Sequence, residues 1–134
     1  MNALDSALYS RLQGTAITNL LPGTTSIYHL QAPDNATKPF IVWYVQGGGD
    51  ENHTAHRTKN LVVFIRAYSG VSAAQAGSID TQIDTALHLA PLTVTGWGNL
   101  WIARETDLEL PEVTPSGVTA YMAGGTYRIR LEKT

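Results

Sequence analysis

The sequence predicts an α+β fold in which a largely antiparallel β-sheet carries two main helices on one face. Three observations predict it: two segments have apolar residues at helical spacing, several have strand character, and their order is helix, three strands, helix, three strands. The chain has 134 residues and shows no internal repeat or change in composition, so we expect residues 1–134 to form a single domain.

The N-terminal segment is expected to be helical. Apolar side chains recur at helical spacing from Leu4 to Leu12, and Gly14 interrupts the pattern. A second, shorter helix is expected over residues 15–21, with Thr15 as its N-cap. The Pro-Gly pair that follows ends this helical region.

Three strands are expected next, at residues 26–30, 40–45 and 61–68. The first is short. The second is apolar on both faces, as expected for a central strand that is covered on each side. The third is a second buried strand with a similar apolar run. Together they predict the first half of the sheet.

A polar connection joins the second and third strands. It spans residues 46–60 and begins with Gly47, Gly48 and Gly49. An irregular loop of this length is uncommon in a compact domain unless it is functional or disordered. The alternative is the tip of a long hairpin whose strands run past the core.

A longer helix is expected in the second half of the chain. Ser72 and Gln75 have the spacing of a capping box. Ile79 and Ile83 belong to the apolar face that follows, and Pro91 ends the helix. This helix is the second of the two that should cover the sheet.

The last three strands are expected at residues 92–95, 100–108 and 119–132, with a tight turn at residues 96–99 and a loop at residues 111–117. The final strand alternates most clearly. Its residues Tyr127, Ile129 and Leu131 should be buried, with charged side chains on the opposite face.

The tryptophans near the end of the chain are candidate interface residues. Alternation predicts that Leu100, Ile102 and Leu108 share one face of their strand and that Trp101 lies on the other. Trp97 falls in a turn flanked by glycines, where full burial is difficult. An exposed tryptophan is a favoured interface anchor. Packing of both rings on the edge of the core is the alternative interpretation.

The composition excludes several classes of protein. There is no cysteine, which excludes disulfides, thiolate metal sites and a cysteine nucleophile. The net charge of -2 and pI of about 6.0 lack the basic excess that grips nucleic acid or an anionic membrane. The longest apolar runs are too short to span a bilayer, and the N-terminus does not resemble a signal peptide. We therefore expect a soluble protein that is made in the cytoplasm.

The sharpest candidate for chemistry is the pair His53 and His56, which lies beside Asp50 and Glu51. These residue types can bind a metal ion, and a metal-dependent hydrolase is one hypothesis. A solvated loop tip explains the same residues without a metal. The glycine run lacks the Gly-Lys-Ser/Thr and the helix of a phosphate-binding loop. We expect no catalytic, cofactor-binding or metal site.

The order of elements resembles a known family, the tail-completion or tail-terminator proteins of long-tailed bacteriophages and gene-transfer particles. The resemblance covers most of the chain. It is carried by a leading helix at residues 3–9, a strand with Ile27 and Tyr28, Pro33, the strand start at residues 39–42, a strand at residues 61–69, a helix ending in Ala86 and Leu87, a late strand with Arg104, a Pro-Ser-Gly loop and the closing Tyr-Arg-Ile-Arg at residues 127–130.

The resemblance implies a structural virion protein of the tail. Such proteins form a homo-oligomeric ring, a hexamer, on the head-proximal end of the tail tube. The ring stops polymerisation of the major tail tube protein and offers a surface to head completion and connector proteins. Genomic DNA passes through the bore without specific binding, and no cofactor, active site or membrane is involved.

The residues expected at interfaces follow from the exposed tryptophans and from the polar connection. We expect unpaired sheet edges and a surface poor in charge to be covered by copies of the chain and by the tube. A small peptide- or sugar-binding module is the competing hypothesis for the same side chains. The expected interface residues are Trp97, Trp101, Gly47, Gly48, Gly49, Asp50, Glu51, His53, His56 and Arg57.

Overall fold

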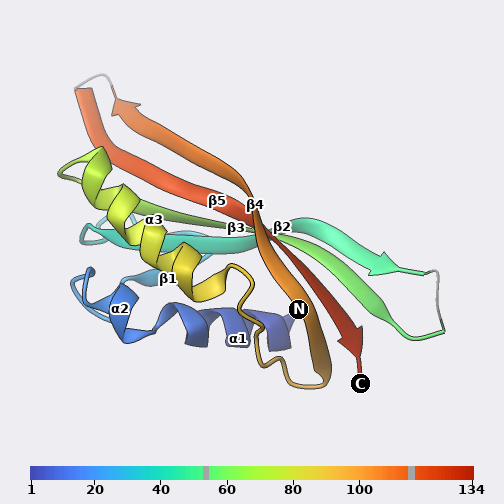
Figure 1. Cartoon of the computed structure of the whole chain (residues 1–134). Helices are drawn as coiled ribbons and strands as arrows, with labels where there is room; N and C mark the ends of the chain where they lie inside the picture. Colours follow the sequence, from blue (N-terminus) through green and yellow to red (C-terminus); the bar gives the residue numbers. More distant parts are fainter. Residues whose placement is uncertain (53–54, 115–116) are drawn as a thin grey trace.

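One twisted sheet forms the body of the protein (Figure 1). The computed structural model describes residues 1–52, 55–114 and 117–134. Within them the strand order is β1-β2-β3-β5-β4; β1 runs parallel to β2, and all other neighbours are antiparallel. The strands are β1 (Ile27–His29), β2 (Phe40–Glu51), β3 (Thr58–Ser69), β4 (Trp97–Thr114) and β5 (Gly117–Lys133).

The helices cover one face of this sheet (Figure 1). They are α1 (Asn2–Leu12), the single turn α2 (Thr15–Thr18) and α3 (Ala73–Leu87). Because the buried side chains of α1 recur at helical spacing, one stripe faces the sheet. The α+β class, the element order and the two main helices on one face are therefore confirmed.

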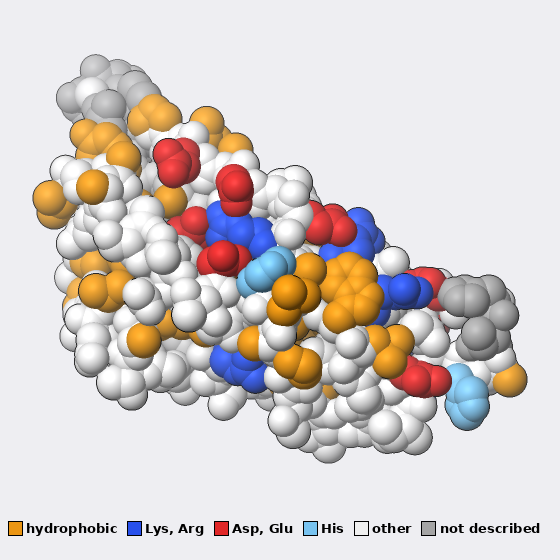
Figure 2. Space-filling model, in the orientation of Figure 1, with side chains coloured by type: hydrophobic (Ala, Val, Ile, Leu, Met, Phe, Trp, Pro, Cys, Tyr) orange, Lys and Arg blue, Asp and Glu red, His pale blue; other side chains and the backbone are white. Residues whose placement is uncertain are grey.

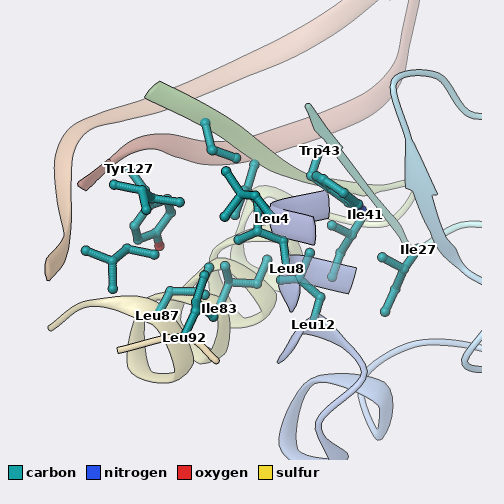
Figure 3. Close-up of a cluster of buried hydrophobic side chains, with 14 of the residues drawn as sticks. Leu4, Leu8, Leu12, Ile27, Ile41, Trp43, Ile83, Leu87, Leu92 and Tyr127 are labelled. Atoms are coloured by element: carbon teal, nitrogen blue, oxygen red, sulfur yellow. The ribbon is translucent and has the colours of Figure 1, made fainter. Parts of the chain in front are cut away.

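The core lies between the helices and the sheet (Figure 3). Its largest members are Trp43 and Tyr127, which are 1 % and 0 % exposed. Alternation along β5 buries Tyr127, Ile129 and Leu131, as predicted. Figure 3 also shows how the helices face the strands through Leu4, Leu8, Leu12, Ile83 and Leu87.

The N-caps of α3 and α2 can be compared with those predicted from the sequence. The Ser72 hydroxyl accepts a hydrogen bond from the Gln75 amide at 3.1 Å, so half of the predicted capping box is present. The Gln75 side chain accepts instead from the Ser69 hydroxyl. The prediction that Thr15 caps α2 is wrong, because Gly14 is the N-cap and Thr15 is the first helical residue.

The segment after α3 differs from its prediction. The helix ends at Leu87, before Pro91. Residues 92–95 do not form a strand and contribute only the isolated bridge between Val94 and Trp97. The Leu92 amide donates a hydrogen bond to the Asn99 side chain at 2.8 Å. This bond takes the place of the one that the amide would have made to a neighbouring strand.

Both predicted connections are largely strand. β2 continues to Glu51 and β3 begins at Thr58, so the long-hairpin alternative describes residues 46–60. β4 likewise continues to Thr114 and β5 begins at Gly117, which shortens the loop expected at residues 111–117. The two hairpins extend past the helices in opposite directions (Figure 1).

Irregular pairing changes which side chains of β4 are buried. The register with β5 shifts between Asn99 and Trp101 and again between Arg104 and Thr106. Leu100 is therefore an extra residue in the strand and is 50 % exposed, whereas Ile102 is 0 % exposed. The prediction that Leu100 shares the face of Ile102 is wrong for this reason.

Candidate functional site

Several of the predicted interface residues lie on or beside the β2–β3 arm, which we define as residues 44–51 of β2 and residues 58–62 of β3. Asp50 accepts hydrogen bonds from the Lys59 ammonium at 2.7 Å and from the Arg57 guanidinium at 3.0 Å. These contacts hold the pKa of Asp50 below its usual value. Cross-strand ion pairs thus accompany the backbone pairing of β2 and β3 in the arm.

Glu51 and Trp101 come together on the helix-free face of the sheet. The Glu51 carboxylate accepts from Arg130 Nε at 3.2 Å and from Arg130 Nη2 at 2.8 Å. Arg130 is directly opposite Trp101 in the ladder between β5 and β4. The structure therefore joins these two predicted interface residues through one arginine.

Trp97 lies on the other face. It pairs with Lys133, and the ammonium groups of Lys59 and Lys133 lie 5.8 and 5.1 Å from its ring centroid. Its ring also packs against the edge of the core. Because Trp97 and Trp101 point to opposite faces, they cannot line one groove, and this geometry does not favour the peptide- or sugar-binding module.

The glycine run is part of β2. Gly48 has φ +102°, and a Cβ there would lie 2.2 Å from the Asn60 carbonyl oxygen, so no other residue fits. A Cβ on Gly47 or Gly49 would meet nothing within 4 Å. Packing within the chain therefore does not require glycine at positions 47 and 49, and these two residues leave the backbone of the arm without side-chain cover.

The metal hypothesis finds little support in the geometry. Asp50 and Glu51 are successive strand residues that point to opposite faces, and each is already paired with cations. His53 lies outside the described residues, and His56 is exposed. Among the residues that the structure describes, no group of three acidic or histidine side chains could hold a metal ion.

The outer edge of β4 is long, but several features protect it from pairing with a further strand. Its pairing with β5 is interrupted by three register shifts, the last between Glu112 and Val113. Glu105, Asp107 and Pro111 also lie along it. Bulges, charges and proline discourage the addition of another strand. Simple edge-to-edge pairing, expected from the sequence, is thus disfavoured at this edge.

The helix-free face of β2 and β3 is rich in aromatic side chains that the sequence analysis did not single out. Phe40 and Tyr68 have ring centroids 5.1 Å apart, and those of Tyr44 and Phe64 are 5.8 Å apart. Phe64 and Tyr68 alternate with buried residues of β3, whereas in β2 Tyr44 is partly exposed and Phe40 is buried. This alternation was the available signal, and it leaves an aromatic surface on the side opposite the helices.

Comparison with known proteins decides the family. The family described as tail completion protein gp17 matches residues 6–126, which is most of the chain. The chain belongs to this family. Its members are structural virion proteins and not enzymes, so this tail completion protein is a component of the virion tail.

Solved structures share the fold. A chain from the virion of a native gene transfer agent particle has a TM-score of 0.82 at 16 % identity, covering 98 % of this chain and 96 % of that one. Bacteriophage SPP1 gp17 protein has a TM-score of 0.54 at 18 % identity, covering 99 % and 90 %. No curated protein sequence matches this tail completion protein. None of its helices within the described residues has the length and hydropathy needed to cross a membrane.

A second feature missed from the sequence is the clamp that joins α3 to β4. Arg104 on β4 donates to both carboxylate oxygens of Asp80 on α3, at 2.9 and 2.7 Å. It also donates to the Gly124 carbonyl at 2.9 Å and to the Tyr127 hydroxyl at 3.1 Å. Gly125 makes room, because a Cβ there would lie 2.8 Å from the guanidinium carbon. Acidic and basic side chains adjoin over this part of the surface (Figure 2).

This clamp is structural in the tail completion protein. Burial opposes the charge on Arg104, but the hydrogen bonds and charge of Asp80 outweigh it and hold the pKa of Arg104 above its usual value. The Tyr127 hydroxyl in turn donates to Asp84 at 3.3 Å. The partners come from three elements, so the clamp fixes α3 against the last two strands.

The clamp predicts a change of stability at alkaline pH. Burial raises the pKa of Tyr127 above its ordinary value of 10.0. The unfolded chain then loses this proton first, so the free energy of unfolding falls as the pH rises above about 10, by at most about 1.4 kcal/mol per pH unit. Tyr127→Phe should remove this part of the slope. Urea unfolding at several alkaline pH values measures it, with the half-exposed Tyr9→Phe as control. Equal slopes in wild type and Tyr127→Phe would contradict the assignment.

Proposed function

We propose that six copies of this chain form a closed ring that caps the head-proximal end of the tail tube. The ring stops polymerisation of the tube protein and presents the surface on which head completion or connector proteins join. Genomic DNA passes through its bore. The proposal refines membership of the tail completion family, which already places the chain in the tail.

The observation that carries the proposal is the extension of one sheet beyond its helices at two opposite ends (Figure 1). β2 runs on to Glu51 although β1 pairs with it only through Trp43. β4 and β5 remain paired to Thr114 and Gly117, past the last β3 pair at Ser69. A cap needs separate surfaces for the tube, for the head and for its neighbours, and two opposed arms supply such surfaces.

The low charge of the surface supports the same proposal. Charged residues make up 15 % of the chain and the net charge is -2. Much of the surface visible in Figure 2 is neither acidic nor basic, which makes it inexpensive to desolvate against a partner. Binding to DNA strengthens with the number of phosphates neutralised, so a bore without a basic excess lets the genome slide.

Electron microscopy of tails made without this protein tests the proposal. We expect tubes of irregular, extended length that fail to join heads. Tails of normal length that lack heads would assign the chain to head joining alone and remove the capping role. Normal tails joined to heads would contradict both roles.

The mass of the isolated protein is a second measurement. Light scattering should give a mass of several times 14.5 kDa as the concentration rises. Exposed tube ends can be added where the free protein associates weakly. A chain that remains monomeric at every concentration, with and without tube, would contradict the ring.

A further inference from the structure

The helix-free face holds one cation whose surroundings are unusual. Arg66 on β3 lies among three rings, with its guanidinium carbon 5.3 Å from the ring centroids of Tyr44 and Phe64 and 5.6 Å from that of Tyr68. We call these four residues the Arg66 surface. Aromatic faces hold a guanidinium in place but accept none of its hydrogen bonds along the ring plane.

Within the part of the chain that the structure describes, the guanidinium of Arg66 donates no hydrogen bond to an acceptor. Its Nε is buried and has no hydrogen-bond partner among the described residues. The other five arginines of the chain all donate to carboxylates or carbonyl oxygens within the described ranges; they are Arg11, Arg57, Arg104, Arg128 and Arg130. Arg66 is thus a partly buried guanidinium, held between aromatic rings, that forms no ion pair within the described residues, and a carboxylate is the group best suited to pair with it.

Space for such a group lies beside the ring cluster. A hollow of about 350 Å³ is bounded by Arg66, Tyr68, Phe40 and Val42 on the sheet and by the segment that precedes β2, including Lys38. Its lining includes two cations, Arg66 and Lys38, one acid, Asp34, and apolar side chains such as Phe40 and Val42. A carboxylate on a partly apolar segment fits this combination.

The same chain carries a matching group on its opposite face. Glu109 on β4 is exposed and has no partner among the described residues. It pairs in the ladder with Ala123, whose β3 neighbour is the core residue Ala67, so it points to the helix side of the sheet. Asp107 lies two residues away on the same side; it accepts a hydrogen bond from Arg104 Nε at 2.5 Å, but its side chain is still 84 % exposed. Other acids, namely Asp50, Glu51, Asp80 and Glu105, are held by cations of their own chain.

We propose that, in the ring of the proposed function on which this inference rests, the acidic stretch of β4 in one copy docks on the Arg66 surface of the next copy, with Glu109 bound by Arg66. Head-to-tail contacts need two different patches, and these patches lie on opposite faces and carry opposite charges. The protected β4 edge suits this mode, because it contributes side chains to a neighbouring face and needs no new strand pairing.

Charge reversal tests the contact. Arg66→Glu and Glu109→Arg should each raise the protein concentration needed for assembly by at least about tenfold, because like charges then meet. The double variant should assemble near the wild-type concentration, since the pair is restored in reverse. Light scattering across a concentration series, with and without tube ends, gives the readout.

Three controls separate the contact from damage to the fold. Arg66→Met keeps an unbranched side chain among the rings without the charge, and should fold normally while assembling less readily. Glu132→Arg reverses an acid at the other end of the sheet and should assemble as wild type does. Circular dichroism and urea unfolding of each variant establish that the monomer is intact.

The outcomes distinguish this contact from the ring itself. A wild type that assembles while Arg66→Glu and Glu109→Arg assemble equally well overturns the contact and leaves the ring standing. Single variants that fail while the double variant also fails overturn the pairing of these two residues. A wild type that never assembles, even on tube ends, overturns the ring and the contact with it.

Discussion

Arg104→Ala is expected to lower the free energy of unfolding by about 3–5 kcal/mol, the largest effect of any single substitution considered for this chain. The Asp80 carboxylate, 17 % exposed, would lose both of its guanidinium hydrogen bonds and remain as a nearly buried charge. The Gly124 carbonyl and the Tyr127 hydroxyl would lose a donor as well. Urea unfolding followed by circular dichroism measures the change.

Two further variants test the cause. Arg128→Ala removes another arginine of the sheet, but its pair with Glu105 is 32 % and 37 % exposed, so the expected loss is only about 0–1 kcal/mol. Arg104→Met combined with Asp80→Leu removes both charges and should recover much of the stability lost in Arg104→Ala. An Arg104→Ala loss no larger than that of Arg128→Ala would show that the clamp is not a stabilising contact.

Local periodicity was enough to predict the helices and the buried face of β5. The spacing of Leu4, Leu8 and Leu12 depends only on the helical repeat, and the burial of Tyr127 and Ile129 depends only on strand alternation. Both patterns can be read from residues that are close together in the sequence. The order of such segments then restricts the fold to helices packed on a mostly antiparallel sheet.

The faces of β4 could not be predicted in the same way. A bulge inserts one residue and reverses the alternation without any change in composition. The sequence predicts that Trp97 lies in a turn, but it is the first residue of β4, and the shift at Leu100 places it on the face opposite Trp101. The sequence therefore identifies both tryptophans as candidates but does not reveal that they have different neighbours.

The clamp and the Arg66 surface were missed for different reasons. Arg104 and Asp80 are 24 residues apart and meet only after α3 packs on the sheet, so no local pattern joins them. Arg66 did have a local signal, because it alternates with Phe64 and Tyr68 on the face opposite the core. That signal was missed because residues 61–68 were interpreted as a buried strand.

Shortening the β2–β3 arm is expected to abolish tail capping while leaving the domain folded. Replacing residues 50–59 with Asn-Gly connects Gly49 to Asn60, which already face each other in the ladder, by a two-residue turn that favours hairpins. The removed ion pairs, Asp50 with Lys59 and Glu51 with Arg130, are partly exposed and contribute little. Leu61 and its partner Ile129 remain, so we expect a stability loss of about 1–2 kcal/mol.

The arm is the part of β2 and β3 that extends past β1 and the helices (Figure 1). If it contacts the tube as we propose, the functional loss should be complete. Complementation of particles that lack the protein, with tail length and head joining scored by electron microscopy, measures it. Asp50→Ala is the matched control: it removes the ion pairs with Arg57 and Lys59 but keeps the length of the arm, and should support normal tails. If the shortened protein folds and still yields tails of normal length joined to heads, then the reach of the arm has no part in capping, and the contacts to the tube lie elsewhere on the sheet.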